Sequence, residues 1–233
     1  MNEKRADSPA AQVLIGTSGQ QPEKAYWSMF TVRELSPQFI ETAKPKTLIN
    51  LRKRTPAHGR FVVPILPDIV SHHFTGDQVD ISWAKVLRAA DILETDQCLL
   101  RTPADFRPTQ ANRDALIRFL NTRCATQVKV AWWAEGLWPS QPDAQLEIKA
   151  ASSVTIVEDP FSLDDDEALM ESAGFYWRVM GGRGMRRGLN DDELEQLMDE
   201  SDDRAQGTII FAGPAVQGDA QRFHRLMAMA DGF

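Results

Sequence analysis

The 233-residue sequence predicts a compact (βα)8 barrel formed by one domain, residues 12–233. In the stretch Gln12–Gly19 an apolar run ends in glycines and small hydroxyl residues, as in a buried strand that leads into a polar loop. Runs of this kind recur along the chain, and helical segments separate most of them. An open doubly wound sheet is the alternative if residues 39–42 do not form a strand.

Eight short apolar runs are the strand candidates, and turn residues bound most of them. They cover residues 13–16, 39–42, 61–66, 98–100, 128–133, 154–157, 175–180 and 208–211. Pro64 does not suit a central strand, because proline has no N–H for the ladder, so we expect a bulge or an irregular strand end there. The connections around the first two strands are short, which predicts an irregular second βα unit.

Helical periodicity and capping residues mark the segments between the strands. Helices are predicted at residues 44–54, 79–93, 109–122, 164–171, 190–200 and 215–230. Pro45 suits the first turn of the first helix, and Thr55 ends it because a residue before proline avoids the helical region. Thr109 and Asn190 are suitable N-cap residues for two later helices.

The composition is that of an ordinary soluble protein, with 42% hydrophobic and 25% charged residues. The net charge of −7 lacks the basic footprint of most nucleic-acid-binding proteins. Residues 1–11 are polar, which predicts a flexible tail without a signal peptide. No apolar run approaches the roughly 18 residues of a membrane helix, so we expect no membrane association and a cytoplasmic protein. Cys98 and Cys124 are expected to be buried thiols.

Several segments in order resemble the YecE-like barrel family, whose function is unknown. These segments are VLIGTSG, TLINLRKRTPAHGRFVV, IVSH, LLRTPADFRPTQANRDALIRFL and FYWRVMG. They correspond to the family patterns GTSGW, WRERTP with FRFAVK, ITH, LPPSFRP and VRLHG, and the match spans about residues 13–229. The resemblance implies a TIM-barrel fold.

Polar positions of that family are replaced here at or near the carboxyl ends of strands. The replacing residues are Pro64, Trp132, Ala134, Met180, Ala212 and Gly213. Because apolar side chains cannot do acid–base chemistry, the resemblance implies a degenerate barrel that is non-catalytic and serves as a protein-binding or assembly component. A protein partner or self-association is therefore expected, and no cofactor.

The alternative function is a hydrolase that acts on a phosphoester or sugar at the barrel mouth. Its candidate residues are Thr17, Ser18, His72, Arg107 and Arg178, which the resemblance retains. His72 and His73 lie in a segment, 67–77, that is predicted to be a long loop. Adjacent histidines on an extended chain point to opposite sides, so we expect no metal site.

Two further groups of residues suggest binding surfaces. The loop GGRGMRRG carries Arg183, Arg186 and Arg187, which could bind an anion and make nucleic-acid binding the third hypothesis. A solvated basic loop is the simpler interpretation. Trp27, Trp132 and Trp138 could form an apolar surface for a partner or ligand at the mouth, or they could fill the core. On a strand, Trp132 and Trp133 must face opposite ways.

Overall fold

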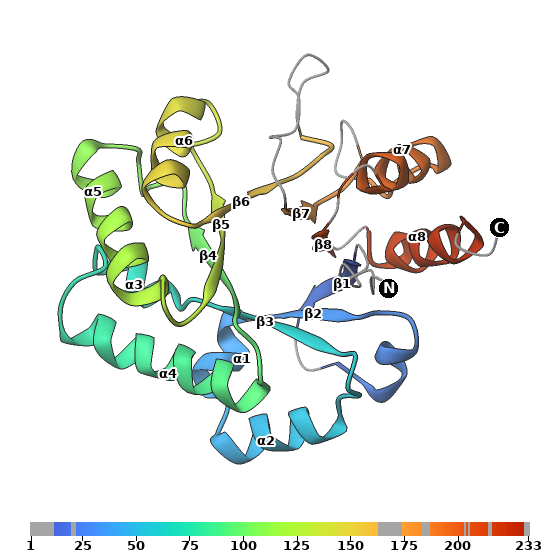
Figure 1. Ribbon diagram of the computed structural model, residues 1–233, viewed down its shortest axis with the longest axis horizontal. Coiled ribbons are helices and arrows are strands. Elements are labelled where there is room, and N and C mark those ends of the chain that lie inside the picture. The colour runs from blue at the N-terminus through green and yellow to red at the C-terminus, as the bar shows by residue number, and fades with distance from the viewer. Residues whose placement is uncertain are drawn as a thin grey trace, which may run out of the picture.

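The computed structural model describes residues 12–19, 22–162, 174–182, 187–202, 204, 206–213 and 216–230. In these residues eight parallel strands form a closed barrel in sequence order, and β8 pairs with β1. Helices lie around the outside of this barrel (Figure 1). The predicted (βα)8 barrel is confirmed, and the open-sheet alternative is wrong.

The strands are short and the helices that follow them vary in length. The strands are β1 (Gln12–Gly19), β2 (Val32–Leu35), β3 (Arg60–Pro64), β4 (Gln97–Thr102), β5 (Lys129–Ala134), β6 (Thr155–Glu158), β7 (Phe175–Val179) and β8 (Gln206–Phe211). The helices are α1 (Pro37–Thr42), α2 (Pro45–Arg54), α3 (Pro67–Ser71), α4 (Asp77–Leu93), α5 (Gln110–Phe119), α6 (Pro142–Ala151), α7 (Asp191–Asp202) and α8 (Gln217–Ala230). A 3₁₀ helix, η1 (Lys24–Ser28), follows β1, and a π-helical turn, η2 (Leu120–Cys124), extends α5.

The second strand is not where the sequence analysis placed it. Residues 39–42 belong to α1, and β2 lies just before this helix. Ser36 is the N-cap of α1, since its Oγ accepts a hydrogen bond from the N–H of Phe39 at 3.3 Å, and Pro37 occupies the first turn. Among the described connections, the one after β1 has a 3₁₀ helix in place of an α-helix, and the second βα unit contains two helices, α1 and α2.

Other expectations differ in detail. The segment 67–77, predicted as a loop, begins with the short helix α3, and α6 was not predicted. Pro64 is the last residue of β3, which agrees with the expected strand end, and the N–H of Ile65 still donates to Leu99 O at 2.8 Å. The predicted tail 1–11 and the predicted helix 164–171 lie outside the described residues.

The barrel interior and the layer between strands and helices form separate cores. The interior is filled by Val32, Val62, Leu99, Ala131, Val157, Tyr176 and Ile210. Alternation along β5 directs Trp133 into this interior and Trp132 into the outer layer under the helices, as predicted. Inward-facing residues at the carboxyl ends of the strands therefore lie at the barrel mouth.

Both cysteine thiols are buried, as expected. Burial raises the pKa of Cys124 to about 12, which keeps this thiol protonated at neutral pH. None of the helices in the described residues is long and apolar enough to span a bilayer.

Candidate ligand-binding site

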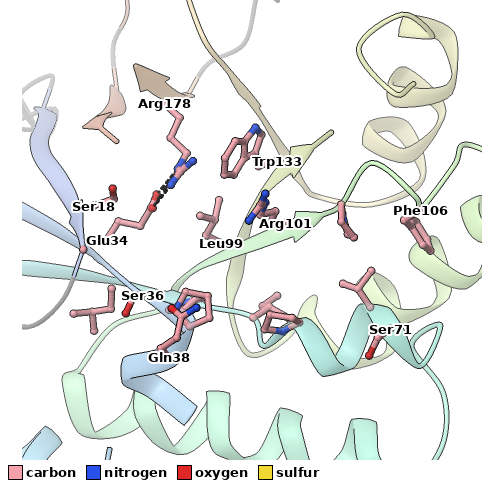
Figure 2. A pocket seen from close by; sticks show the side chains of 18 of the residues that line it. Ser18, Glu34, Ser36, Gln38, Ser71, Leu99, Arg101, Phe106, Trp133 and Arg178 are labelled. Atoms are coloured by element: carbon pink, nitrogen blue, oxygen red, sulfur yellow. Dashed lines mark hydrogen bonds and ion pairs between the residues drawn. The ribbon is translucent and has the colours of Figure 1, made fainter. Parts of the chain in front are cut away.

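A cavity of about 630 Å³ opens at the carboxyl ends of the barrel strands. Its lining includes Ser18 from β1, Glu34 from β2, Arg101 from β4, Trp133 from β5 and Arg178 from β7 (Figure 2). Barrel enzymes place their chemistry on this face. The volume also lies within the range of small-molecule sites.

A buried ion pair joins β2 to β7 across the barrel mouth. Arg178 Nη2 donates to Glu34 Oε1 at 2.8 Å and Arg178 Nε donates to Oε2 at 3.0 Å (Figure 2). The hydroxyl of Tyr176 donates to the same Oε2 at 2.8 Å. The side chains of Glu34 and Arg178 are only 4% and 11% exposed. Charges removed from water to this extent are tolerated because each is paired and hydrogen-bonded.

The surroundings fix the protonation of the two partners of Glu34. Burial lowers the pKa of Arg178, but the charge of Glu34 and its hydrogen bonds outweigh this effect, so the pKa rises. Burial, together with the Glu34 charge, raises the pKa of Tyr176 well above its usual value. At neutral pH Tyr176 therefore stays a hydrogen-bond donor and Arg178 stays a cation.

Trp133 lies next to two guanidinium groups. The Cζ of Arg178 is 3.9 Å from the centre of the Trp133 ring system, and that of Arg101, the register partner of Trp133 on β4, is 4.9 Å away. Arg101 also forms a bidentate ion pair with Glu135, at 2.8 and 2.9 Å. Its side chain is 59% exposed, so this guanidinium is accessible from the open side of the cavity.

Asp159 is a second, partly buried acid close to this cluster, although it does not line the cavity. It follows β6, and its carboxylate accepts hydrogen bonds from the N–H groups of Phe161, at 3.2 Å, and Met180. Burial raises the pKa of Asp159 to about 6, against the smaller opposing effects of these hydrogen bonds and of Arg178. The carboxyl group therefore ties the end of β6 to the end of β7.

Of the five predicted catalytic candidates, the structure brings Ser18 and Arg178 to the cavity. Thr17 faces the outer layer, where its N–H donates to the Tyr26 oxygen at 2.8 Å and its Oγ1 accepts from Arg33. The other two candidates, His72 and Arg107, are exposed and are not lining residues. The neighbour His73 lines the cavity instead.

The predicted tryptophan surface is not formed. Trp132 and Trp138 are fully buried, and Trp27 is 6% exposed. The indole N–H of Trp132 donates to Thr102 Oγ1 at 3.0 Å, and that of Trp138 donates to the carbonyl oxygen of Phe106 at 2.6 Å. These side chains fill the core, which was the alternative interpretation of the sequence.

The arginine loop is described only in part. Arg183 and Arg186 lie outside the described residues. Arg187 forms a bidentate ion pair with Glu193, at 2.9 and 2.8 Å, so the charge of this arginine is neutralised within the protein. Its use as an anion-binding residue stays a prediction.

Glu34 and Arg101 were not predicted as site residues. Glu34 was missed because the sequence analysis placed the second strand at residues 39–42. The signal that could have found it is the helix start at Ser36 and Pro37, which indicates that a strand ends just before Ser36. Arg101 directly follows the predicted strand 98–100, but one polar residue there is a weak signal without the register that puts it beside Trp133.

The described residues contain no group of three or more histidine, cysteine, aspartate or glutamate side chains arranged to hold a metal ion. The chemistry available in the described cavity is hydrogen bonding and charge pairing. Donors come from the arginines and serines, and acceptors come from the carboxylates.

No protein-family model matches the chain, and no curated protein matches it either. Solved structures do match. A DUF72 family protein from Enterococcus faecalis V583 is 13% identical with a TM-score of 0.67, covering 94% of this chain and 98% of that one. A DUF72 family protein from Thermotoga maritima MSB8 is 15% identical with a TM-score of 0.69, covering 93% and 99%. This chain has a TIM-barrel fold like theirs.

Sugar epimerases share the barrel at a lower level of similarity. D-psicose 3-epimerase from Clostridium cellulolyticum H10, solved with D-tagatose, is 10% identical with a TM-score of 0.56, covering 93% of this chain and 97% of that one. Identities this low establish a common fold only. What this chain does must be argued from its own cavity.

Proposed function

We propose that the barrel mouth binds a small polyhydroxylated molecule, a sugar or a sugar derivative, and that the protein is a non-catalytic ligand-binding barrel. The observation that carries this proposal is the cluster of Glu34, Arg178, Arg101 and Trp133 on one side of the cavity. The exposed guanidinium of Arg101 offers donors beside Trp133, and the Ser18 hydroxyl, which donates to the carbonyl oxygen of Ala212, still offers an acceptor. Hydroxyl groups suit such a surface, because each can both donate and accept a hydrogen bond.

The balance of charge favours hydroxyl groups over a strongly charged ligand. Among the described residues, the cavity lining holds two carboxylates, Glu34 and Asp105, and two guanidinium groups, Arg101 and Arg178. These charges cancel, so a multiply charged anion would gain little from this described part of the lining. A neutral or singly charged polar molecule loses less free energy on desolvation there.

Binding without catalysis is supported by how the buried carboxylate of the cavity is held. Both oxygens of Glu34 are engaged, by Arg178 and by Tyr176, which leaves this carboxylate poorly placed to move a proton. We also propose that the chain is a degenerate YecE-like barrel, because Met180 and Ala212 occupy positions where that family carries polar groups. The hydrolase hypothesis stays a prediction with two of its five residues at the cavity.

Calorimetric titration with three probes tests the proposal. D-glucose, D-glucuronate and D-glucose 6-phosphate share one ring and differ in charge. We expect glucose or glucuronate to bind with a dissociation constant below about 1 mM, and the phosphate to bind no more tightly. The epimerase likeness makes D-tagatose and D-fructose sensible further probes.

Two variants test whether the probes bind in the cavity. Arg101→Ala should weaken binding of the tightest probe at least tenfold, because it removes an exposed donor beside Trp133. Arg123→Ala is the matched control, since Arg123 also forms an exposed ion pair, with Asp80, outside the cavity lining. Absence of binding by all five sugars, or equal losses in both variants, would overturn the proposal.

The protein-partner hypothesis, the nucleic-acid hypothesis and a cytoplasmic location stay predictions. The partner hypothesis has lost the exposed tryptophan surface that motivated it. A tagged pull-down together with light scattering on the pure protein tests it, and a stoichiometric partner or a stable oligomer would restore it.

A further inference from the structure

We infer that the ligand of this cavity carries an apolar substituent on its polar head, and that the substituent lies between α3 and the loop that follows β4. This inference rests on the proposed function, because it concerns the other end of the same cavity. The polar head lies at Glu34 and Arg178. Figure 2 shows Phe106 and Ser71 on the side of the cavity away from these two residues.

Four of the twenty described lining residues of the cavity are prolines. Pro37, Pro64, Pro67 and Pro103 all belong to the lining, from α1, β3, α3 and the loop after β4. Proline has no backbone N–H, so four wall positions offer no main-chain donor to a ligand. A polar group placed against these walls would lose its hydrogen bonds to water with few replacements.

Apolar side chains complete the end of the cavity away from the ion pair. Ile65, Val70 and Phe106 line it, each nearly buried in the protein. The hydroxyl of Ser71, at the rim, already donates within the protein, to the carbonyl oxygen of Asp68 at 3.1 Å. The exposed side chains of His73 and Asp105 also belong to the lining here, so this end of the cavity has apolar walls with polar groups among them.

The apolar wall is held in place by a strained turn. His73 and Phe74 both have positive φ, 49° and 62°, which is unfavourable for residues other than glycine. This turn lets His73 line the cavity while Phe74 packs beneath it against Phe106 and Phe119, with ring centres 5.5 and 5.0 Å apart. Buried aromatic contacts stabilise the strained backbone, so the apolar end is formed before a ligand arrives.

The size of the cavity agrees with a two-part ligand. A volume of about 630 Å³ belongs to the range that holds drug-sized molecules, which are larger than one sugar ring. A sugar at the ion pair would leave the end of the cavity near Phe106 to water. An apolar substituent that displaces this water gains affinity by about fourfold for each methylene that becomes fully buried.

A homologous series of ligands tests the inference by calorimetry. The probes are methyl, butyl and octyl β-D-glucopyranoside and the matching β-D-galactopyranosides, each below its critical micelle concentration. We expect the affinity to rise at least tenfold from the methyl to the butyl glycoside. Affinity that does not change with chain length, while the methyl glycoside binds, would overturn the inference and leave the proposed function standing.

Two variants separate the cavity from nonspecific binding of alkyl chains. Pro67→Glu puts a carboxylate into the apolar end, and the first turn of α3 tolerates an acidic residue. It should reduce the gain from methyl to butyl to less than threefold, and because the gain is a ratio it is read independently of any effect on the methyl glycoside itself. Ile81→Glu, at an exposed position of α4 outside the cavity lining, should keep the full gain.

The remaining outcomes are also decisive. If Ile81→Glu reduces the gain as much as Pro67→Glu does, the alkyl chains bind elsewhere and the inference is wrong. If no glycoside of either series binds at all, the proposed function fails and the inference fails with it.

Discussion

Glu34 and Arg178 stabilise each other in a place where neither would be tolerated alone. The two side chains come from β2 and β7, which are separated in the barrel by β1 and β8. Each is almost inaccessible to water, so the loss of one partner leaves an uncompensated buried charge. The pair therefore supports both the polar end of the cavity and the closure of the barrel mouth.

Glu34→Ala should lower the free energy of unfolding by about 3–5 kcal/mol, the cost of breaking a buried ion pair. The double variant Glu34→Leu with Arg178→Met should be more stable than Glu34→Ala, because it leaves no unpaired charge. Urea denaturation followed by circular dichroism measures both. Asp80→Ala, which breaks the exposed pair with Arg123, should cost less than about 1 kcal/mol. A double variant no more stable than Glu34→Ala would contradict this account.

Asp159 should make stability depend on pH. Its pKa is about 6 in the folded protein and near 3.8 when unfolded, so between these values the folded state holds a proton that the unfolded state has lost. The contribution of Asp159 to stability is thus largest below pH 4, falls as the pH rises through 4–6, and is constant above about pH 7. The total fall is on the order of 1–3 kcal/mol.

The contribution of Asp159 is measured as the difference in unfolding free energy between the protein and Asp159→Asn at pH 4.0, 5.0, 6.0 and 7.5. Asparagine keeps an acceptor for the N–H groups of Phe161 and Met180 but does not titrate. A difference that is the same at all four values would show that Asp159 has no raised pKa.

At the scale of single elements, helix starts position the site. Ser36 and Pro37 begin α1 immediately after β2, which ends the strand one residue past Glu34. At α7 the start is reciprocal: Asn190 Oδ1 accepts from the N–H of Glu193, and Glu193 Oε2 accepts from the N–H of Asn190, both at 2.8 Å. This is a capping box.

Removing the α7 cap should have a small and specific effect. Asn190→Ala should lower the free energy of unfolding by about 1 kcal/mol, because the N–H of Glu193 loses its acceptor. Asn190→Ser should retain most of the stability, since serine is also a good N-cap residue. The midpoint of urea denaturation measures both changes. Equal losses in the two variants would show that the cap is not the cause.

At the scale of the whole molecule, the barrel closes because its strands can approach without obstruction. Gly16 on β1 is the Cα partner of Val32 on β2. A Cβ at Gly16 would lie 1.8 Å from the carbonyl oxygen of Val32 and 2.9 Å from the hydroxyl of Tyr26. The glycine therefore permits a close contact between the first two strands.

Gly16→Ala should destabilise the protein by about 1–3 kcal/mol or more, because backbone must move to make room. Gly218→Ala is the matched control: nothing lies within 4 Å of the added Cβ, and the position is helical. That change should be neutral or stabilising by up to about 1 kcal/mol. Thermal unfolding of both variants measures the effect, and a tolerated Gly16→Ala would contradict the proposed close contact.

The sequence by itself determined the (βα)8 architecture and most of its elements, because short apolar runs, helical periods and capping residues are local signals. Ser18 and Arg178 were expected at the mouth because the family resemblance retains them, and the structure brings both to the cavity but not Thr17, His72 or Arg107, which were chosen on the same ground. Only the tertiary structure decided that Glu34 meets Arg178, that Arg101 lies beside Trp133, and that Trp132 and Trp138 are buried. These facts depend on barrel closure and on strand register, which bring together residues far apart in the chain, and no local pattern records them.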